Sequence, residues 1–186
     1  MSSGSNTNSV LDMEETPCTV PIEYLRHEKA DIRSFDAKYV VHHFYVRCTE
    51  LADTPVPLDA NPRRPENTTQ VQAMRETLTS SPKDFVSKNN GIVILASEVK
   101  TKDEGVDENK TDTGVGITEL EFQDGEGVCN GGHTLLAIQR YAEDEDAIVH
   151  IEVIELDSVR ATDADKRQEI SQIAEARNNN NQLEER

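Results

Sequence analysis

The sequence contains no tryptophan, and aromatic residues together make up only 4% of its 186 residues. Aromatic side chains supply the largest buried areas in most protein cores, so this core must be built mainly from aliphatic residues. Hydrophobic residues amount to 35% of the chain, which is enough for one domain with a lean core. A second globular domain is therefore not expected.

Cysteine is scarce as well, and long apolar runs are missing. Cys18, Cys48 and Cys129 are an odd number of cysteines, and no Cys-x-x-Cys pair occurs. This pattern argues against a disulfide framework and a zinc knuckle, and no metal site is predicted. No apolar run reaches the length of a membrane span, and the polar N-terminus does not resemble a secretory signal. We therefore expect a soluble cytoplasmic protein without a membrane partner.

Basic residues are few compared with acidic ones. The 19 Lys and Arg residues face 36 Asp and Glu residues, which gives a formal net charge of −17 at pH 7. Such a surface repels nucleic acid phosphates, so direct nucleic acid binding is doubtful unless arginines cluster locally. The same acidity, with more Arg than Lys, is typical of proteins that stay soluble in concentrated salt. The composition thus indicates a halophile-like protein or a merely acidic mesophile one.

The chain is expected to consist of a polar tail and one core domain. Residues 1–16 are rich in Ser, Asn, Thr and Glu and should be disordered. The core domain is assigned to residues 17–186. Within it, the proline-rich residues 54–65 and the charged residues 100–114 are predicted to be loops.

Short β-branched runs and longer amphipathic segments alternate irregularly along the core domain. The short runs predict strands, and the amphipathic segments predict helices. An irregular order of this kind favours an α+β (mixed α/β) fold, in which helices flank a mixed sheet in a single domain. Strands are predicted at residues 39–48, 92–96, 117–122 and 147–156, and helices near residues 67–80, 132–142 and 162–178.

Two strands carry more detailed predictions. The glycine-containing turn at residues 124–127 predicts that the strand at 117–122 forms a β-hairpin with a strand ending at Val128-Cys129. In the strand at 147–156, the alternation of apolar and polar residues predicts that His150 faces outward.

The last helix has both a start signal and a buried face. Thr162 followed by Asp165 resembles a capping box, in which each residue satisfies a backbone N–H group of the other. Helical spacing then places four residues on one face of this helix. They are Ile170, Ile173, Ala174 and Arg177.

The segment Asn130-Gly131-Gly132-His133-Thr134 joins a predicted strand to a predicted helix. Two glycines allow positive φ angles and close approach of a ligand, and the unpaired N–H groups of a helix start attract phosphate or carboxylate. Asn130, His133 and Thr134 add side-chain donors at the same point. The alternative is that the glycines form only a turn and that Asn130 caps the helix.

Three short motifs follow one another in a fixed order. Asn61-Pro62-Arg63 precedes a helix, Asn89-Asn90-Gly91-Ile92 precedes a strand, and the segment from Asn130 to Thr134 opens a helix. This order resembles the abortive-infection phage-resistance (AIPR) family. A later Ile173-Ala174-x-x-Arg177-Asn178 element, with Gln182 nearby, is similar to that family's Asn- and Gln-rich element, so the resemblance covers about residues 39–182.

The segment from Asn130 to Thr134 is also similar to the helix start of the ParB and sulfiredoxin superfamily and to DGQHR proteins of DNA phosphorothioation systems. This wider resemblance implies a ParB-like or sulfiredoxin-like fold, and a helix start that binds the phosphates of a nucleoside triphosphate such as ATP or CTP. Cys129 precedes Gly131, which argues against sulfiredoxin chemistry. Thr134 stands where those relatives keep an arginine, so phosphate binding would recruit Arg63 or Arg64 from the preceding loop.

The resemblance therefore implies a nucleotide- or phosphate-binding module of an antiphage defence system, which could also have a protein partner. Its expected site consists of the backbone of Gly131, Gly132 and His133 with Asn130 and Thr134, the arginines Arg63 and Arg64, and a wall of Asn89, Asn90 and Gly91. Family members are usually longer, so the chain resembles their N-terminal core, either as a compact relative or as a fragment.

Three other functions stay open at the level of the sequence. A nucleotide or phosphodiester hydrolase could use His133 as an acid or base, but the acidic residues show no spacing typical of a metal-dependent hydrolase, and we favour a protein without catalysis. A DNA-binding regulator of a DNA-modification system would need Arg63, Arg64 and Arg140 to cluster. The third is a non-catalytic interaction scaffold, whose Asn residues only cap turns and helix ends.

Overall fold

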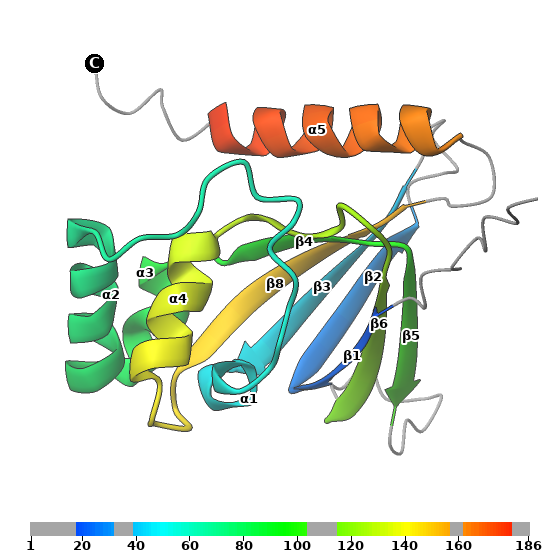
Figure 1. The fold of residues 1–186 in the computed structure, drawn as a ribbon. Coiled ribbons are helices and arrows are strands. Elements are labelled where there is room, and N and C mark those ends of the chain that lie inside the picture. Colours follow the sequence, from blue (N-terminus) through cyan, green and yellow to red (C-terminus); the bar gives the residue numbers. More distant parts are fainter. Residues whose placement is uncertain (1–17, 32–38, 104–114, 157–161, 180–186) are drawn as a thin grey trace, which may run out of the picture.

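The computed structural model describes residues 18–31, 39–103, 115–156 and 162–179, so the tail predicted at residues 1–16 lies outside the described residues. Its strands form two sheets (Figure 1). The smaller sheet has the order β1-β6-β5, and the larger has the order β2-β3-β8-β4-β7. The strands are β1 (Cys18–Tyr24), β2 (Arg26–Asp31), β3 (Val40–Arg47), β4 (Ile92–Ala96), β5 (Glu98–Asp103), β6 (Gly116–Phe122), β7 (Gly127–Asn130) and β8 (Ile148–Glu155).

The five-stranded sheet is mixed. Strand β4 runs parallel to β8, with Ile92 opposite Ile151, whereas β2 and β3, β3 and β8, and β4 and β7 are antiparallel pairs. The predicted α+β single domain with a mixed sheet is therefore confirmed.

The two sheets are joined where strands pass from one to the other. Strand β1 continues into β2 through Leu25, whose N–H group donates to the carbonyl oxygen of Tyr45 at 2.8 Å. Strand β4 continues into β5 through Ser97, whose N–H group donates to the carbonyl oxygen of Glu121 at 2.9 Å. The main core contains buried aliphatic and aromatic residues of both sheets, among them Val20, Tyr24, Phe44, Ile94 and Leu120.

Helices cover both faces of the five-stranded sheet. Ile94 belongs to the main core together with Leu135 of α4, whereas its neighbour Leu95 packs in a second cluster with Ile170 and Ala174 of α5. Because successive residues of a strand point to opposite faces, α4 and α5 lie on opposite sides of β4 (Figure 1). The helices are α1 (Cys48–Ala52), α2 (Thr69–Ser80), α3 (Phe85–Lys88), α4 (Gly132–Tyr141) and α5 (Asp163–Asn179), with a short 3-10 helix at Pro82–Asp84. None of them, within the described ranges, is long and apolar enough to cross a membrane.

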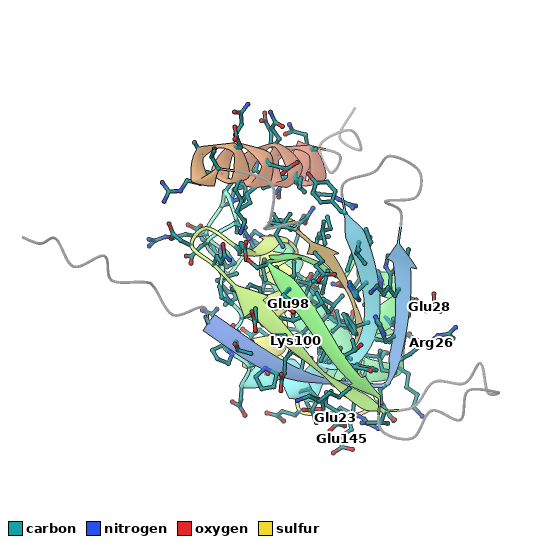
Figure 2. The ribbon with its side chains drawn as sticks, turned by 90° about the vertical axis from the view of Figure 1, so that its right-hand side faces the viewer. Glu23, Arg26, Glu28, Glu98, Lys100 and Glu145 are labelled. Carbon is teal, nitrogen blue, oxygen red and sulfur yellow. The ribbon has the colours of Figure 1, made fainter. Side chains whose placement is uncertain are left out.

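The loop predicted at residues 100–114 is wrong in its first part, because residues 98–103 form strand β5. The segment is rich in charged residues, but its lysines form ion pairs with carboxylates of the neighbouring strand: Lys100 pairs with Glu121, and Lys102 pairs with Glu119 at 2.9 Å. Figure 2 shows Lys100 beside Glu98 on the outer side of this sheet. Ion pairs across the strands thus accommodate a sequence that looks like a solvated loop. Residues 104–114 lie outside the described residues.

The predicted β-hairpin between residues 117–122 and Val128-Cys129 is also wrong. Strand β6 pairs with β1 and β5, whereas β7 pairs with β4 in the other sheet. The turn between them therefore carries the chain from one sheet to the other. Glu126 in this turn is fully buried and accepts hydrogen bonds from the hydroxyl group of Ser97 and the N–H group of Gln123, which holds the turn at the corner where β4 becomes β5.

Helix α5 begins as the sequence predicts. The N–H group of Asp165 donates to the Thr162 hydroxyl oxygen at 3.3 Å, and the N–H group of Thr162 donates to the Asp165 carboxylate at 3.4 Å, which confirms the capping box. The helix buries few apolar residues, chiefly Ile170 and Ala174. Much of the contact between α5 and the rest of the protein is therefore polar. It includes the ion pair between Lys166 Nζ and the carboxylate of the buried Glu126, at 2.9 Å.

Candidate functional site

The two glycine turns of the predicted site pack directly against each other. Gly91 and Gly131 have φ angles of +79° and +84°, in the left-handed region that glycine tolerates best. A Cβ atom at Gly131 would lie 2.5 Å from the carbonyl oxygen of Gly91, and one at Gly91 would lie 2.4 Å from the carbonyl oxygen of His150. Both glycines are thus required by backbone contact between β4, β7 and β8.

Asn89 and Thr134 fasten the same two segments together through side chains. The Asn89 Oδ1 atom accepts a hydrogen bond from the N–H group of Gly91 at 2.7 Å, and its Nδ2 atom donates to the Thr134 hydroxyl oxygen at 3.2 Å. Thr134 is buried. These two side chains therefore hold the start of β4 against the first turn of α4.

The loop with Asn61 covers the first residue of α4. A Cβ atom at Gly132 would lie 2.3 Å from Asn61 Nδ2 and 3.7 Å from the Cβ atom of Pro65. Asn61 Oδ1 in turn accepts a hydrogen bond from the N–H group of Arg63 at 3.1 Å. Arg63 and Arg64 therefore belong to the loop that passes over the helix start. Both are exposed, and neither forms an ion pair with any residue in the described ranges.

Among the described residues no side chain caps the start of helix α4, whose N-cap residue is Gly131, and the alternative in which Asn130 caps it is wrong. The Asn130 Nδ2 atom instead donates to the main-chain carbonyl oxygen of Arg177 at 2.7 Å. Next to it, the Nδ2 atom of Asn178 donates to the carbonyl oxygen of Cys129 at 2.9 Å. The last turns of α5 are thereby fixed to the end of β7, immediately before the start of α4.

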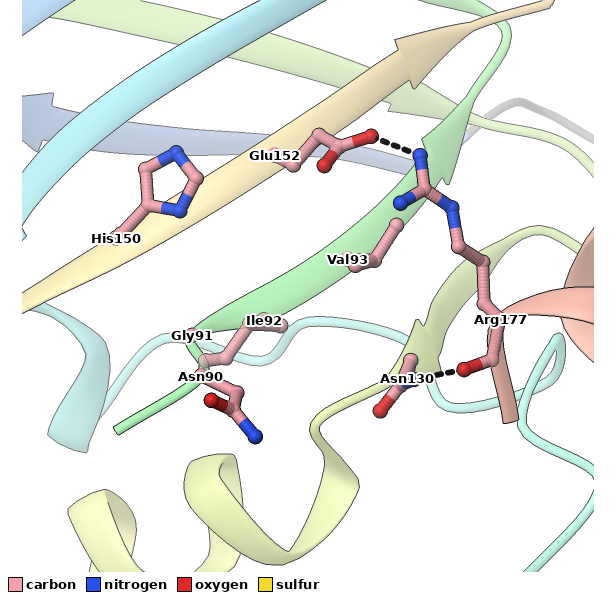
Figure 3. A pocket seen from close by; sticks show the side chains of 8 residues that line it. All are labelled: Asn90, Gly91, Ile92, Val93, Asn130, His150, Glu152 and Arg177. Atoms are coloured by element: carbon pink, nitrogen blue, oxygen red, sulfur yellow. Dashed lines mark hydrogen bonds and ion pairs between the residues drawn. The ribbon is translucent and has the colours of Figure 1, made fainter. Parts of the chain in front are cut away.

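A cavity of about 210 Å³ lies where these segments meet (Figure 3). Strand β4 and the residues before it form one wall, β8 forms another, and Asn130 and Arg177 close it on the side of β7 and α5. It is lined by Asn90, Gly91, Ile92, Val93, Asn130, His150, Glu152 and Arg177. Of the residues predicted for the site, Asn90, Gly91 and Asn130 line this cavity.

The charged groups of the cavity come from β8 and α5. The guanidinium group of Arg177 donates to the carboxylate of Glu152. The Arg177 side chain is 40% exposed and that of Glu152 is 16% exposed, so the cation lies at the mouth and the carboxylate deeper. The pair leaves further guanidinium N–H groups available, because an arginine carries five of them.

His150 contributes an imidazole ring that packs against residues of the neighbouring strand β3. Its Nε2 atom lies 3.1 Å from Nδ1 of His43 on β3, and the two rings stack with centroids 5.3 Å apart. Tyr45 flanks the same ring at a centroid distance of 5.3 Å. His150 lies on the face of β8 opposite the main core, as the alternation predicts, but it is half-buried in the cavity rather than exposed to solvent.

Burial lowers the pKa of His150 below its ordinary value of 6.5, and the nearby His43 lowers it further, although Glu152 and Glu28 act in the opposite direction. The unfolded imidazole therefore binds a proton more readily than the folded one. At alkaline pH the imidazole is neutral in both states, so His150 does not change the free energy of unfolding. That free energy decreases as the pH falls from about 6.5 through the pKa of the folded state. We expect His150→Gln to flatten the pH dependence of the free energy of unfolding between pH 7.5 and 5.5, as measured by urea denaturation at several pH values. An unchanged slope of the free energy of unfolding against pH would contradict this expectation.

Glu155 affects stability in a separate pH range. A hydrogen bond from His42 is the main cause that lowers the pKa of Glu155, so its contribution to stability is lost as the pH falls below 4.5.

The remaining predicted residues lie outside the cavity. Gly131 is the N-cap residue of α4, Gly132 and Thr134 lie in its first turn, and His133 is half-buried there. Arg140 is in the last turn of α4, roughly 12 Å along the helix axis from Gly132, so it is remote from the loop with Arg63 and Arg64. Sequence reasoning missed His150, Glu152 and Arg177 as site residues. The alternation in β8 and the helical spacing of Arg177 were the signals that could have indicated them.

Comparison with known protein families supports the order of motifs on which the site was predicted. The family model described as AIPR protein matches residues 58–186. The chain belongs to the AIPR family. This AIPR match contains the loop with Asn61, both glycine turns, the cavity residues of β8 and the end of α5. The match confirms the predicted family membership. The AIPR family is associated with abortive-infection phage resistance. No curated protein and no solved structure matches the chain, and the resemblance to ParB and sulfiredoxin stays a prediction.

Proposed function

We propose that this AIPR chain is a nucleotide- or phosphate-binding module of a phage-defence system. The observation that carries the proposal is the convergence of four separate segments around one cavity and one uncapped helix start. These segments contain Asn61, Asn90-Gly91, Asn130-Gly131 and Arg177. A protein that needs these residues only for local turns has no reason to bring all of them to one place.

The chemistry of this region suits a phosphate. In the described part of the chain no side chain caps the backbone N–H groups in the first turn of α4, and a helix start attracts anions. Arg63 and Arg64, which form no ion pair with the described residues, add guanidinium groups on the loop that covers this turn, and planar guanidinium groups match phosphate well. Arg177 adds a further cation on the cavity side of Asn130.

We propose binding without catalysis: the histidine that lines the cavity is His150, and its Nε2 atom lies 3.1 Å from Nδ1 of His43. His133, the acid or base candidate from the sequence, does not line the cavity. The carboxylate that does line it, Glu152, is engaged by Arg177. A DNA-binding role is less well supported, because Arg140 lies at the opposite end of α4 from Arg63 and Arg64. A partner protein of the defence system could still bind selectively to the ligand-bound form.

A thermal-shift screen with ATP, CTP, GTP and a non-hydrolysable ATP analogue tests the proposal. A ligand present at 100 times its dissociation constant should stabilise the protein by about 2.7 kcal/mol. The screen is best performed in both moderate and concentrated salt, because the acidic surface repels anions when it is unscreened. If none of these nucleotides raises the melting temperature in either salt, the proposal is wrong.

Replacing Arg177 with methionine should weaken nucleotide binding about 10- to 100-fold, because a charge-assisted hydrogen bond contributes about 1.5–3 kcal/mol. Isothermal titration calorimetry measures the change. Arg167→Met is a matched control on the same helix, since Arg167 is 71% exposed and pairs only with Asp124 among the described residues. Equal affinities for the two variants would show that Arg177 does not contact the ligand.

A further inference from the structure

The cavity presents hydrogen-bond acceptors as well as a cation. Glu152 brings a carboxylate that is 16% exposed, and Arg177 donates to its Oε1 atom. The Nδ2 atom of Asn130 is used by the carbonyl oxygen of Arg177, which leaves its amide oxygen for the cavity. Figure 3 shows this oxygen on the side of Asn90, away from Arg177.

These acceptors impose a condition on the ligand. A nucleotide phosphate is largely deprotonated at neutral pH and then carries no donor, so a phosphate alone would place negative oxygen atoms against the carboxylate of Glu152 and the amide oxygen of Asn130. Hydroxyl groups donate to both of these atoms. A sugar with two adjacent hydroxyl groups satisfies a carboxylate particularly well, as acidic residues do with ribose in dinucleotide-binding proteins.

The size of the cavity points to the same part of a nucleotide. Its volume is about 210 Å³, below the roughly 300–1,000 Å³ of pockets that enclose a complete drug-sized ligand. A sugar fits such a volume, whereas the phosphates and the base must extend beyond it. Arg177 at the mouth and the start of α4 next to Asn130 are where attached phosphates would find cations and N–H groups.

From these observations we infer that Glu152 and Asn130 bind the ribose hydroxyl groups of the ligand, so that the protein selects ribonucleotides over deoxyribonucleotides. This inference rests on the proposed function and specifies its ligand class. Glu152 then has two roles: it orients the guanidinium group of Arg177, and it accepts a hydrogen bond from the sugar.

Calorimetric titration with ATP, CTP and GTP and with their 2′-deoxy forms tests the inference on the unmodified protein. We expect each ribonucleotide that binds to bind roughly 10-fold or more tightly than its deoxy form, because a hydrogen bond to a charged acceptor is lost. Ribose 5-phosphate should likewise bind more tightly than 2-deoxyribose 5-phosphate. Equal affinities within the pairs would overturn the ribose assignment and leave the proposed function standing. Absence of binding by all of them would overturn both.

Two variants separate sugar recognition from phosphate recognition. Glu152→Gln should reduce the ratio of ribonucleotide to deoxyribonucleotide affinity. Arg177→Met should weaken both forms and preserve the ratio. Circular dichroism and melting temperature establish that each variant is folded. A ratio that is unchanged in Glu152→Gln, or lost in Arg177→Met, would contradict the assignment of Glu152 to the sugar.

Discussion

Replacing Gly131 with alanine is expected to reduce the free energy of unfolding by roughly 2–5 kcal/mol. Gly131 has a φ angle of +84°, and a Cβ atom there would lie 2.5 Å from the carbonyl oxygen of Gly91 and 2.9 Å from the Cα atom of Ile92. The left-handed conformation costs a non-glycine residue about 1–2 kcal/mol. The clash adds about 1–3 kcal/mol, because the neighbouring atoms belong to the backbone of β4 and cannot rotate away.

Gly125 provides a matched control for the backbone conformation alone. Its φ angle is +81°, and apart from Gly125 itself and its two chain neighbours no heavy atom of the described residues lies within 4 Å of the position of a Cβ atom. Gly125→Ala should therefore cost only the conformational part, about 1–2 kcal/mol. Urea denaturation of both variants measures the difference. If Gly131→Ala destabilises the protein no more than Gly125→Ala does, the close approach of the two glycine turns does not exist in solution.

The local signals of the sequence predict much of the fold. The capping box of Thr162 and Asp165 depends on residues three positions apart, so it is visible without knowledge of the rest of the chain. Strand β3 also appears where the β-branched run predicts it, and alternation places the adjacent residues His42 and His43 on opposite faces. These features depend on periodicity within one segment.

Strands β1 and β2 were not predicted from the sequence, and two further errors in the fold concern pairing between distant segments. Strand β5 is stabilised by ion pairs of Lys100 and Lys102 with residues of β6, and the charged sequence of β5 contains no sign of that partner. The turn before β7 looks like a hairpin turn, but buried Glu126 binds Ser97, which lies 29 positions earlier in the chain. A short-range pattern does not contain this information.

The candidate site likewise contains residues that the local sequence predicts and residues that it does not. Gly131 and Asn130 are visible in the sequence as a strand, turn and helix start, and Asn90-Gly91 as another turn. The other half of the cavity comes from His150 and Glu152, which look like ordinary polar residues of a half-exposed strand, and from Arg177, which looks like the edge of a helix face. Their importance follows from the topology, because β8 lies beside β4 and the end of α5 is fixed to the end of β7.

Replacing Glu126 with glutamine is expected to destabilise the protein by about 3 kcal/mol, in the range for breaking a buried ion pair. Glu126 is fully buried, its carboxylate lies 2.9 Å from Nζ of Lys166, and it accepts hydrogen bonds from Ser97 and from the N–H group of Gln123. Glutamine preserves the volume but removes the charge opposite Lys166, whose side chain is only 14% exposed. It also turns an NH₂ group toward other donors, so part of the hydrogen bonding is lost.

The neighbouring pair of Asp124 and Arg167 shows why burial decides the outcome. It joins the same turn to the same helix at 3.1 Å, but both side chains are largely exposed, at 66% and 71%. Asp124→Asn should therefore cost less than about 1 kcal/mol, and that cost should disappear in concentrated salt, whereas the loss in Glu126→Gln should persist. Hydrogen exchange should also accelerate in the first turns of α5 in Glu126→Gln, because Lys166 anchors them to the sheets. Equal effects of the two substitutions would mean that the Ile170 and Ala174 contacts, rather than the buried ion pair, hold this helix in place.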